Sequence, residues 1–113
     1  MKPRILIVDD DPGLARLMTI TLQRGGFDVV TAGSLYEARE KSGTFDGIVA
    51  DVKLPNGDGR HLREHYPTVP MLIISGAPVD DPQEVSTGAI PFLAKPFHPN
   101  HLTDAVRALV GVV

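Results

Sequence analysis

The sequence predicts one α/β domain of three layers, in which helices cover both faces of a five-stranded parallel sheet. Five apolar runs alternate with segments of helical character over residues 1–113, and the connections between them are short. This alternation favours parallel strands joined by right-handed crossovers. A length of 113 residues with 42% hydrophobic residues suits a single domain with one core.

The composition argues against several classes of protein. Without cysteine, the chain can form neither disulfides nor a thiolate zinc site. A net charge of −3 gives no basic excess for direct contact with nucleic acid or an anionic membrane. No apolar stretch approaches the roughly 20 residues that span a bilayer, and the N-terminus lacks the pattern of a signal peptide. We expect a cytoplasmic location and no nucleic-acid or membrane partner.

The first two strands are predicted at residues 5–8 and 27–32. Residues 5–8 are a continuous apolar run, which is typical of a strand buried on both faces. Between these strands we expect a helix with Asp11 as N-cap and Pro12 as its first residue, ended by Gly25-Gly26. Apolar residues at helical spacing form its expected buried face: Leu14, Leu17, Met18 and Leu22.

A short second helix is predicted after Ser34, to about residue 41. Ser34 and Glu37 have the spacing of a capping box. The charged residues of this segment are interpreted as a solvated helix face: Glu37, Arg39, Glu40 and Lys41. The third strand is expected at residues 45–51, because this apolar run is too short for a buried helix and is bounded by Gly43 and Pro55.

A loop and a weak helix are predicted after the third strand. Asp58, between Gly57 and Gly59, is interpreted as a turn residue and not as a ligand. Residues 59–66 suggest a helix of about two turns, in which Leu62 is the only strong apolar anchor.

The last two strands are predicted at residues 69–75 and 90–95. Pro70 can lie only at the start of its strand. Prolines confine any helix between these strands to residues 82–87, which have almost no apolar face. The final helix is expected to begin near Pro99, and its apolar residues form a clear stripe: Leu102, Ala105, Val106, Leu109 and Val110.

Polar residues follow four of these strands at the same edge of the predicted sheet. Asp9 and Asp10 follow the first strand, while Asp51, Ser75 and Lys95 end the third, fourth and fifth strands. Parallel strands bring such residues to one cleft. Carboxylates close together repel one another and favour a cation, and oxygen ligands suit Mg²⁺. A hydroxyl group and a lysine beside a metal-bound carboxylate are what phosphoryl transfer needs.

In kind, order and spacing, these residues resemble a response-regulator receiver domain of two-component signalling. The resemblance covers essentially the whole chain and is carried by four motifs: Asp9-Asp10, the segment 51–59, Ser75-Gly76-Ala77, and Gly88-Ala89 leading to residues 92–97. It implies a flavodoxin-like (βα)5 fold, similar to chemotaxis receivers, with the sheet order 2-1-3-4-5. The spacings from Asp51 to Ser75 and from Ser75 to Lys95 are short for this family, so we expect trimmed third and fourth helices.

The resemblance implies that Asp51 is a phosphoacceptor. It would receive a phosphoryl group from a phosphohistidine on a sensor histidine kinase or a phosphotransfer protein. Asp10 and Asp51 would ligate Mg²⁺ or Mn²⁺ through their side chains, and Lys53 through its backbone carbonyl. Asp9 would act through metal-bound water.

Three further residues would complete the switch that the resemblance implies. Lys95, followed by a cis peptide bond to Pro96, would hold the phosphoryl oxygens. Ser75 would move toward the phosphate, and Phe92 would change rotamer with it. A phosphoryl group adds about −1.5 to −2 charge, which makes nearby donors re-pair. We therefore expect a signalling switch that changes contacts with a downstream protein and is not an enzyme beyond its own phosphorylation and dephosphorylation. A phosphorylation-dependent dimer remains open.

Alternative interpretations give these residues less specific roles. The chain could be a pseudo-receiver that serves as a docking module without phosphorylation, and the acids at residues 9–11 could merely favour a helix N-terminus. His61, Glu64 and His65 match the H-x-x-E-H pattern of inverted zinc proteases, yet no further ligand is evident nearby. We expect no output domain within residues 1–113, and the sequence leaves open whether this receiver acts alone or within a longer protein.

Overall fold

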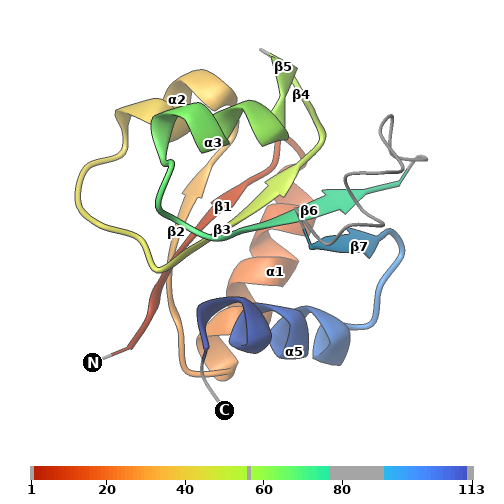
Figure 1. Cartoon of the computed structure of the whole chain (residues 1–113). Coiled ribbons are helices and arrows are strands. Elements are labelled where there is room, and N and C mark those ends of the chain that lie inside the picture. The colour runs from red at the N-terminus through yellow and green to blue at the C-terminus, as the bar shows by residue number, and fades with distance from the viewer. Residues whose placement is uncertain (1, 56, 77–90, 112–113) are drawn as a thin grey trace.

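The computed structural model describes residues 2–55, 57–76 and 91–111 (Figure 1). Five parallel strands form one sheet in the order β2-β1-β3-β6-β7. Their bounds are β1 (Arg4–Val8), β2 (Asp28–Ala32), β3 (Gly47–Asp51), β6 (Met71–Ser75) and β7 (Phe92–Ala94). In chain order this is the arrangement 2-1-3-4-5, so the predicted flavodoxin-like fold is confirmed.

Helices cover both faces of the sheet, as Figure 1 shows. One face carries α1 (Pro12–Arg24) and α5 (Pro99–Val110), and the other carries α2 (Leu35–Glu40) and α3 (Leu62–His65). Alternate residues of β1 point to the two sides. Ile5 and Ile7 pack in the core beneath α1 and α5, whereas Leu6 and Val8 pack beneath α2 and α3. The sheet is therefore buried on both faces, as the continuous apolar runs predict.

Helix α1 begins where the sequence predicts, but one residue of its expected buried face is exposed. The Asp11 carboxylate accepts hydrogen bonds from the backbone N–H groups of Gly13 (2.9 Å) and Leu14 (3.2 Å). Met18 and Leu22 are fully buried, whereas Leu17 is 48% exposed. Successive helical residues are rotated by about 100°, and α1 is turned so that Met18 faces the core while Leu17 lies at the exposed edge of the apolar stripe. The prediction that Leu17 is buried was wrong.

Helix α2 is held at its start by two reciprocal contacts. Ser34 Oγ accepts a hydrogen bond from Glu37 N (3.1 Å), and the Glu37 carboxylate accepts one from Gly33 N (2.9 Å), one residue earlier than a standard capping box. Glu37, Arg39 and Glu40 are exposed as predicted, but Lys41, the C-cap, is partly buried.

Strand β3 is two residues shorter than predicted, because Asp46 interrupts the ladder. Its carboxylate accepts a hydrogen bond from Arg4 N (2.8 Å) in place of a strand partner. The Arg4 guanidinium lies 4.6 Å from the centre of the Phe45 ring and donates to the carbonyls of Ser42 and Thr44. Phe45 is therefore buried in the loop that precedes the strand.

The loop after β3 contains a small hairpin that the sequence does not predict. β4 (Lys53–Leu54) pairs antiparallel with β5 (Gly57–Asp58). The expected helix over 59–66 begins as a 3-10 turn, η1 (Gly59–His61), and continues as α3, with Leu62 fully buried as predicted. Asp58 accepts hydrogen bonds from Arg60 N (2.8 Å) and from the Arg60 side chain. Burial alone would raise the pKa of Asp58, but these bonds outweigh it and lower that pKa.

The remaining elements lie close to their predicted places. Strands β6 and β7 begin two residues later than expected, and α5 begins at Pro99 with Leu102 and Val106 fully buried. The predicted helical stretch 82–87 and the first residue of the predicted fifth strand lie outside the described residues. In the described parts of the chain, no helix has the length and apolar character needed to cross a membrane.

Tyr66 joins the end of α3 to the end of α2, and its hydroxyl provides a first test of the fold. It donates hydrogen bonds to the carbonyls of Ala38 (2.8 Å) and Lys41 (3.4 Å), and burial raises the pKa of Tyr66. We expect Tyr66→Phe to lower the free energy of unfolding by about 1 kcal/mol in urea titrations, because both carbonyls lose the hydrogen bond from the hydroxyl group. Tyr36, which is 66% exposed, provides the control: Tyr36→Phe should change it by less than about 0.5 kcal/mol. Equal losses in both variants would contradict this role.

Gly59 provides a second test, because it lies directly against the backbone of Asp51. A Cβ atom at Gly59 would lie 2.1 Å from the Asp51 carbonyl oxygen, and Gly59 N already donates to Val52 O at 3.0 Å. We expect Gly59→Ala to lower the free energy of unfolding by about 2 kcal/mol or more. Gly33→Ala should cost less than about 0.5 kcal/mol, because no atom lies within 4 Å of a Cβ there. A Gly59→Ala variant as stable as the Gly33→Ala control would refute the close approach.

Candidate functional site

Three carboxylates meet at the carboxyl ends of β1 and β3. Val8 and Ala50 are partners in the parallel ladder, so the residues that follow them emerge at the same level of the sheet. Oxygen atoms of Asp9, Asp10 and Asp51 lie within 4.8 Å of one another. Asp9 is buried, Asp51 is partly buried and Asp10 is exposed. The structure thus brings together the acids that the sequence predicts.

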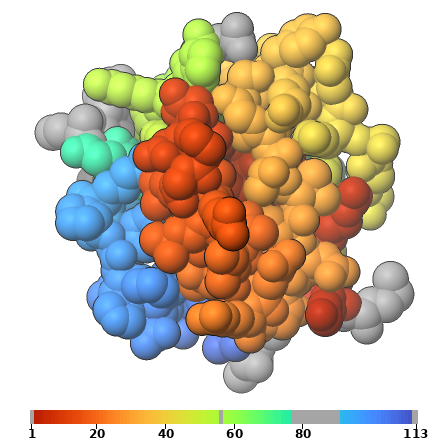
Figure 2. Space-filling model, turned by 180° about the vertical axis from the view of Figure 1, so that it is seen from behind, coloured from red at the N-terminus to blue at the C-terminus, as the bar shows by residue number. Residues whose placement is uncertain are grey.

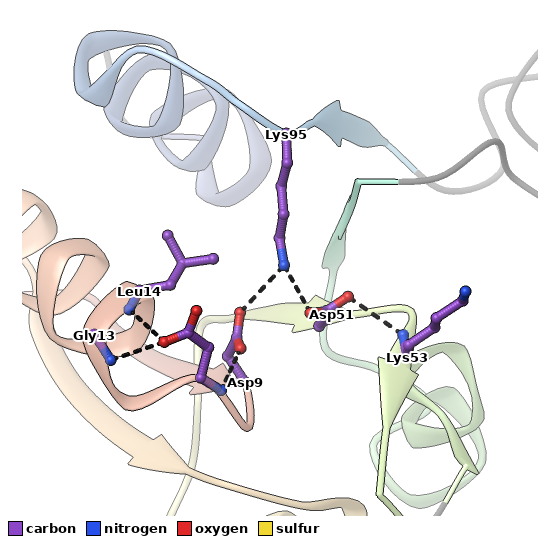
Figure 3. Close-up of polar contacts among 7 residues, drawn as sticks. Asp9, Gly13, Leu14, Asp51, Lys53 and Lys95 are labelled. Atoms are coloured by element: carbon purple, nitrogen blue, oxygen red, sulfur yellow. Dashed lines mark hydrogen bonds and ion pairs between the residues drawn. The ribbon is translucent and has the colours of Figure 1, made fainter.

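Lys95, which directly follows β7, directs its side chain toward this cluster (Figure 3). Its Nζ lies 2.8 Å from Asp51 Oδ2 and 3.8 Å from Asp9 Oδ2. Burial lowers the pKa of Lys95, but the hydrogen bond to Asp51 and the charge of Asp9 outweigh it, so the net shift is upward. The backbone N–H of Lys95 donates to Ser75 O at 2.9 Å. The Lys95–Pro96 peptide bond is cis, as predicted.

Asp9 carries a buried oxygen that lacks a hydrogen bond. Its Oδ1 accepts from Asp11 N (2.8 Å), whereas its Oδ2 has no hydrogen-bond partner among the described residues. Burial raises the pKa of Asp9, and the Asp11 hydrogen bond and the Lys95 charge oppose that rise only in part. Buried polar atoms in proteins nearly always have a partner. An unsatisfied carboxylate oxygen among three acids fits a divalent cation with oxygen ligands.

Ser75 and Phe92 lie on neighbouring strands next to the acids. Ser75 is buried at the end of β6, in register with Ala94 on β7. Phe92 opens β7 opposite Ile73 and is partly buried against the core beneath α2 and α3. Ser75 therefore lies beside the acids, and Phe92, on the neighbouring strand, packs against the core. Its coupled motion remains a prediction.

Lys53 contacts Asp51 through its backbone, while its side chain is exposed. Lys53 N donates to Asp51 Oδ1 at 3.2 Å. Figure 3 shows the Lys53 side chain extending away from the Asp51 carboxylate and from Lys95. The role of the Lys53 carbonyl as a metal ligand remains a prediction.

The geometry does not support the zinc-protease hypothesis. His61, Glu64 and His65 are exposed. Within residues 2–55, 57–76 and 91–111, the only group of acidic or histidine side chains compact enough to hold a metal ion is the three-acid cluster. Asp58, interpreted as a turn residue, caps η1.

The sequence reasoning missed two positioning contacts at the site. Asp11 was expected only as a helix cap, but its backbone N–H also orients the Asp9 carboxylate. A carboxylate that accepts from the N–H two residues later forms an Asx-turn, and the Asp9-Asp10-Asp11 run could have indicated one. The packing of Gly59 against Asp51 has no comparable local pattern.

Comparison with known proteins agrees with this geometry. Residues 5–107 match the family model described as the response regulator receiver domain. The chain is 34% identical to the alkaline phosphatase synthesis transcriptional regulatory protein PhoP of Bacillus subtilis, over 97% of this chain and 49% of that protein. It is 37% identical to the DNA-binding response regulator MtrA of Mycolicibacterium smegmatis, over 96% of this chain and 50% of that protein. The chain spans about half the length of these two relatives.

Solved structures show the same fold. The chemotaxis response regulator CheY4 of Vibrio cholerae superposes with a TM-score of 0.81 at 27% identity, covering 96% of this chain and 99% of that one. The response regulator TrrA of Thermotoga maritima, in complex with Mg²⁺-BeF, gives a TM-score of 0.80 at 28% identity, with the same coverage. With the acids, the lysine and the strand order all in place, the chain belongs to the response regulator receiver domain family of two-component signalling.

Proposed function

We propose that this chain is a switch operated by phosphorylation of Asp51, with the phosphoryl group coming from a phosphohistidine on a sensor histidine kinase or phosphotransfer protein. The observation that carries the proposal is the contact of Lys95 Nζ with Asp51 Oδ2 at 2.8 Å, beside two further acids within 4.8 Å. One carboxylate, one ammonium group and a set of hard oxygen ligands are the parts that phosphoryl transfer to a carboxylate requires.

Each of these side chains has a defined task in the transfer. An oxygen of Asp51 forms a bond to phosphorus while the P–N bond of the donor breaks, and the electron pair of that bond leaves with the imidazole. Lys95, already hydrogen-bonded to Asp51, can donate to the phosphoryl oxygens as they arrive. Because the ammonium group is held in place before the reaction, it stabilises the developing charge without rearrangement.

Asp10 and Asp51 would hold Mg²⁺ or Mn²⁺ through their side chains, Lys53 through its carbonyl and Asp9 through water. A divalent ion bound there neutralises charge on the phosphoryl oxygens. The Mg²⁺-BeF complex of the similar TrrA and the unsatisfied Oδ2 of Asp9 support this part of the proposal. Titration with each ion in thermal unfolding discriminates between Mg²⁺ and Mn²⁺.

Ser75 and Phe92 would convert the modification into a change of surface. A phosphoryl group adds strong acceptors, so the Ser75 hydroxyl moves to donate to it, and the partly buried Phe92 side chain follows into the space vacated near β6. The changed surface then selects a downstream protein or a second copy of the chain. Relatives named as a transcriptional regulatory protein and as a DNA-binding response regulator support a downstream output. We place this switch in the cytoplasm, and the net charge of −3 argues against direct contact of residues 1–113 with nucleic acid.

The alternative of a phosphorylation-independent docking module is not favoured. Such a module has no need to keep an acid cluster and a lysine in contact, because like charges at one edge of a sheet cost stability. Here Asp9, Asp51 and Lys95 are in ion-pair contact.

The central test is phosphorylation by acetyl phosphate in the presence of Mg²⁺, followed by intact-protein mass spectrometry. We expect one phosphoryl group on the native chain and none on Asp51→Asn, because Asp51 is the carboxylate that accepts the hydrogen bond from Lys95 Nζ. Asp28→Asn, which removes an exposed carboxylate at the start of β2, should be labelled like the native chain. Equal labelling of Asp51→Asn would refute the assignment.

Thermal unfolding tests the metal site independently. A ligand that binds only the folded state at 100 times its Kd stabilises it by about 2.7 kcal/mol, so MgCl₂ should raise Tm. Asp10→Asn should abolish most of this shift, whereas Asp104→Asn, at an exposed position on α5, should retain it. A parallel titration with MnCl₂ ranks the two ions. An unchanged shift in Asp10→Asn would place the metal elsewhere.

A further inference from the structure

A cavity of about 660 Å³ opens beside the acid cluster, between α1 and the segment from the end of β2 through α2. Asp9 and Asp10 line it, so it adjoins the proposed phosphorylation site. Its walls also carry two basic side chains, Arg16 from α1 and Lys41 from the end of α2. Figure 2 shows α1 at the centre of this side of the molecule, with the orange and yellow segment that includes α2 beside it.

Neither basic side chain has a polar partner among residues 2–55, 57–76 and 91–111. Among the residues that the structure describes, neither Arg16 nor Lys41 forms a side-chain hydrogen bond or an ion pair. Lys41 is partly buried as a residue. The wall's other acid, Glu37, already accepts a hydrogen bond from Gly33 N at 2.9 Å. Two basic side chains therefore line the cavity without an ion pair to another described residue.

An anion is the ligand that this arrangement fits. A guanidinium group binds carboxylates and phosphates through paired N–H donors, and an ammonium group adds a point charge. Two hydroxyl groups, from Thr19 and Thr31, line the same cavity. Thr19 Oγ1 donates to Ala15 O at 2.8 Å and so presents an acceptor, which leaves recognition of an anion to the basic side chains.

We propose that Arg16 and Lys41 form a second anion subsite, which binds an anionic group that the phosphodonor carries besides the phosphoryl group it transfers. This inference rests on the proposed function, because two acids that line the cavity, Asp9 and Asp10, lie within 4.8 Å of the proposed phosphoacceptor Asp51. The anion could belong to a small acyl phosphate with a second phosphate group, or to an acidic side chain near the phosphohistidine of a protein donor.

The subsite would make the chain selective among phosphodonors. An exposed ion pair contributes up to about a 5-fold change in affinity, so two together should favour a donor with a second anion by about 10-fold at low salt. Screening should reduce this preference as ionic strength rises. A donor without a second anion gains nothing from either side chain.

The first arm of the test compares two small donors in the presence of Mg²⁺. Phosphorylation rates are measured with acetyl phosphate, which carries no second anion, and with 1,3-bisphosphoglycerate, which does. We expect the ratio of the second rate to the first to fall by about 10-fold in the Arg16→Gln/Lys41→Gln variant. The control is Arg24→Gln/Arg39→Gln, which removes the same charge from exposed positions on α1 and α2 outside the cavity. Its ratio should change by less than about 2-fold.

The second arm uses a helical peptide that carries phosphohistidine, with either glutamate or glutamine one turn away. A preference for the glutamate peptide that disappears in Arg16→Gln/Lys41→Gln identifies a protein donor, and a selective loss with 1,3-bisphosphoglycerate identifies a small one. Unchanged ratios in both arms would overturn the subsite while leaving the proposed function intact. If acetyl phosphate does not label the native chain at all, the proposed function fails and the subsite fails with it.

Discussion

Electrostatic repulsion at one edge of the sheet is the constraint on which this structure depends. Oxygen atoms of Asp9, Asp10 and Asp51 lie within 4.8 Å of one another, so their ionised carboxylates repel one another. The register of β1 and β3 sets the backbone positions from which both acids project, so the strand pairing itself brings them close. Lys95 offsets part of this repulsion through contacts with both. Three acids facing one ammonium group still leave an excess of negative charge, which makes the site receptive to a cation.

The grouping of the site residues was predictable from the sequence, because these residues lie at the carboxyl ends of the predicted strands. Continuous apolar runs indicate strands buried on both faces, and parallel pairing then brings the residues that follow them to one edge. The hairpin of β4 and β5 was not predictable, because two-residue strands held by backbone pairing have no side-chain period. The exposure of Leu17 and the partial burial of Lys41 were missed for a related reason. Both depend on tertiary packing: the rotation of α1 about its axis decides the exposure of Leu17, and the path of the chain at the end of α2 decides that of Lys41. The spacing of apolar residues does not contain this information.

Strand β7 is short, yet it carries one residue of the proposed switch and leads directly into another residue of the site. It has three residues, pairs with β6 in the described sheet, and carries Phe92 at one end while leading into Lys95 at the other. Few hydrogen bonds hold such a strand, so it belongs to the part of the fold that can adjust at low cost. If Phe92 responds to phosphorylation as we propose, a change in the contacts of Lys95 has only three residues of β7 to cross before it reaches the Phe92 ring. The Ser75 carbonyl accepts a hydrogen bond from Lys95 N at 2.9 Å, so Lys95 is also connected to β6.

The 44 residues that separate Lys95 from Asp51 also set an order for biosynthesis. A ribosome completes β1 and β3, with all three acids, well before it adds the lysine that offsets them. A nascent chain that stops short of β7 therefore carries the full mutual repulsion of the cluster with no internal counter-charge. Domains tend to fold as units once enough of the chain has emerged, and here the edge strand and the counter-ion arrive together. The contacts of Lys95 with Asp9 and Asp51 can therefore form only after β7 and the lysine that follows it have been synthesised.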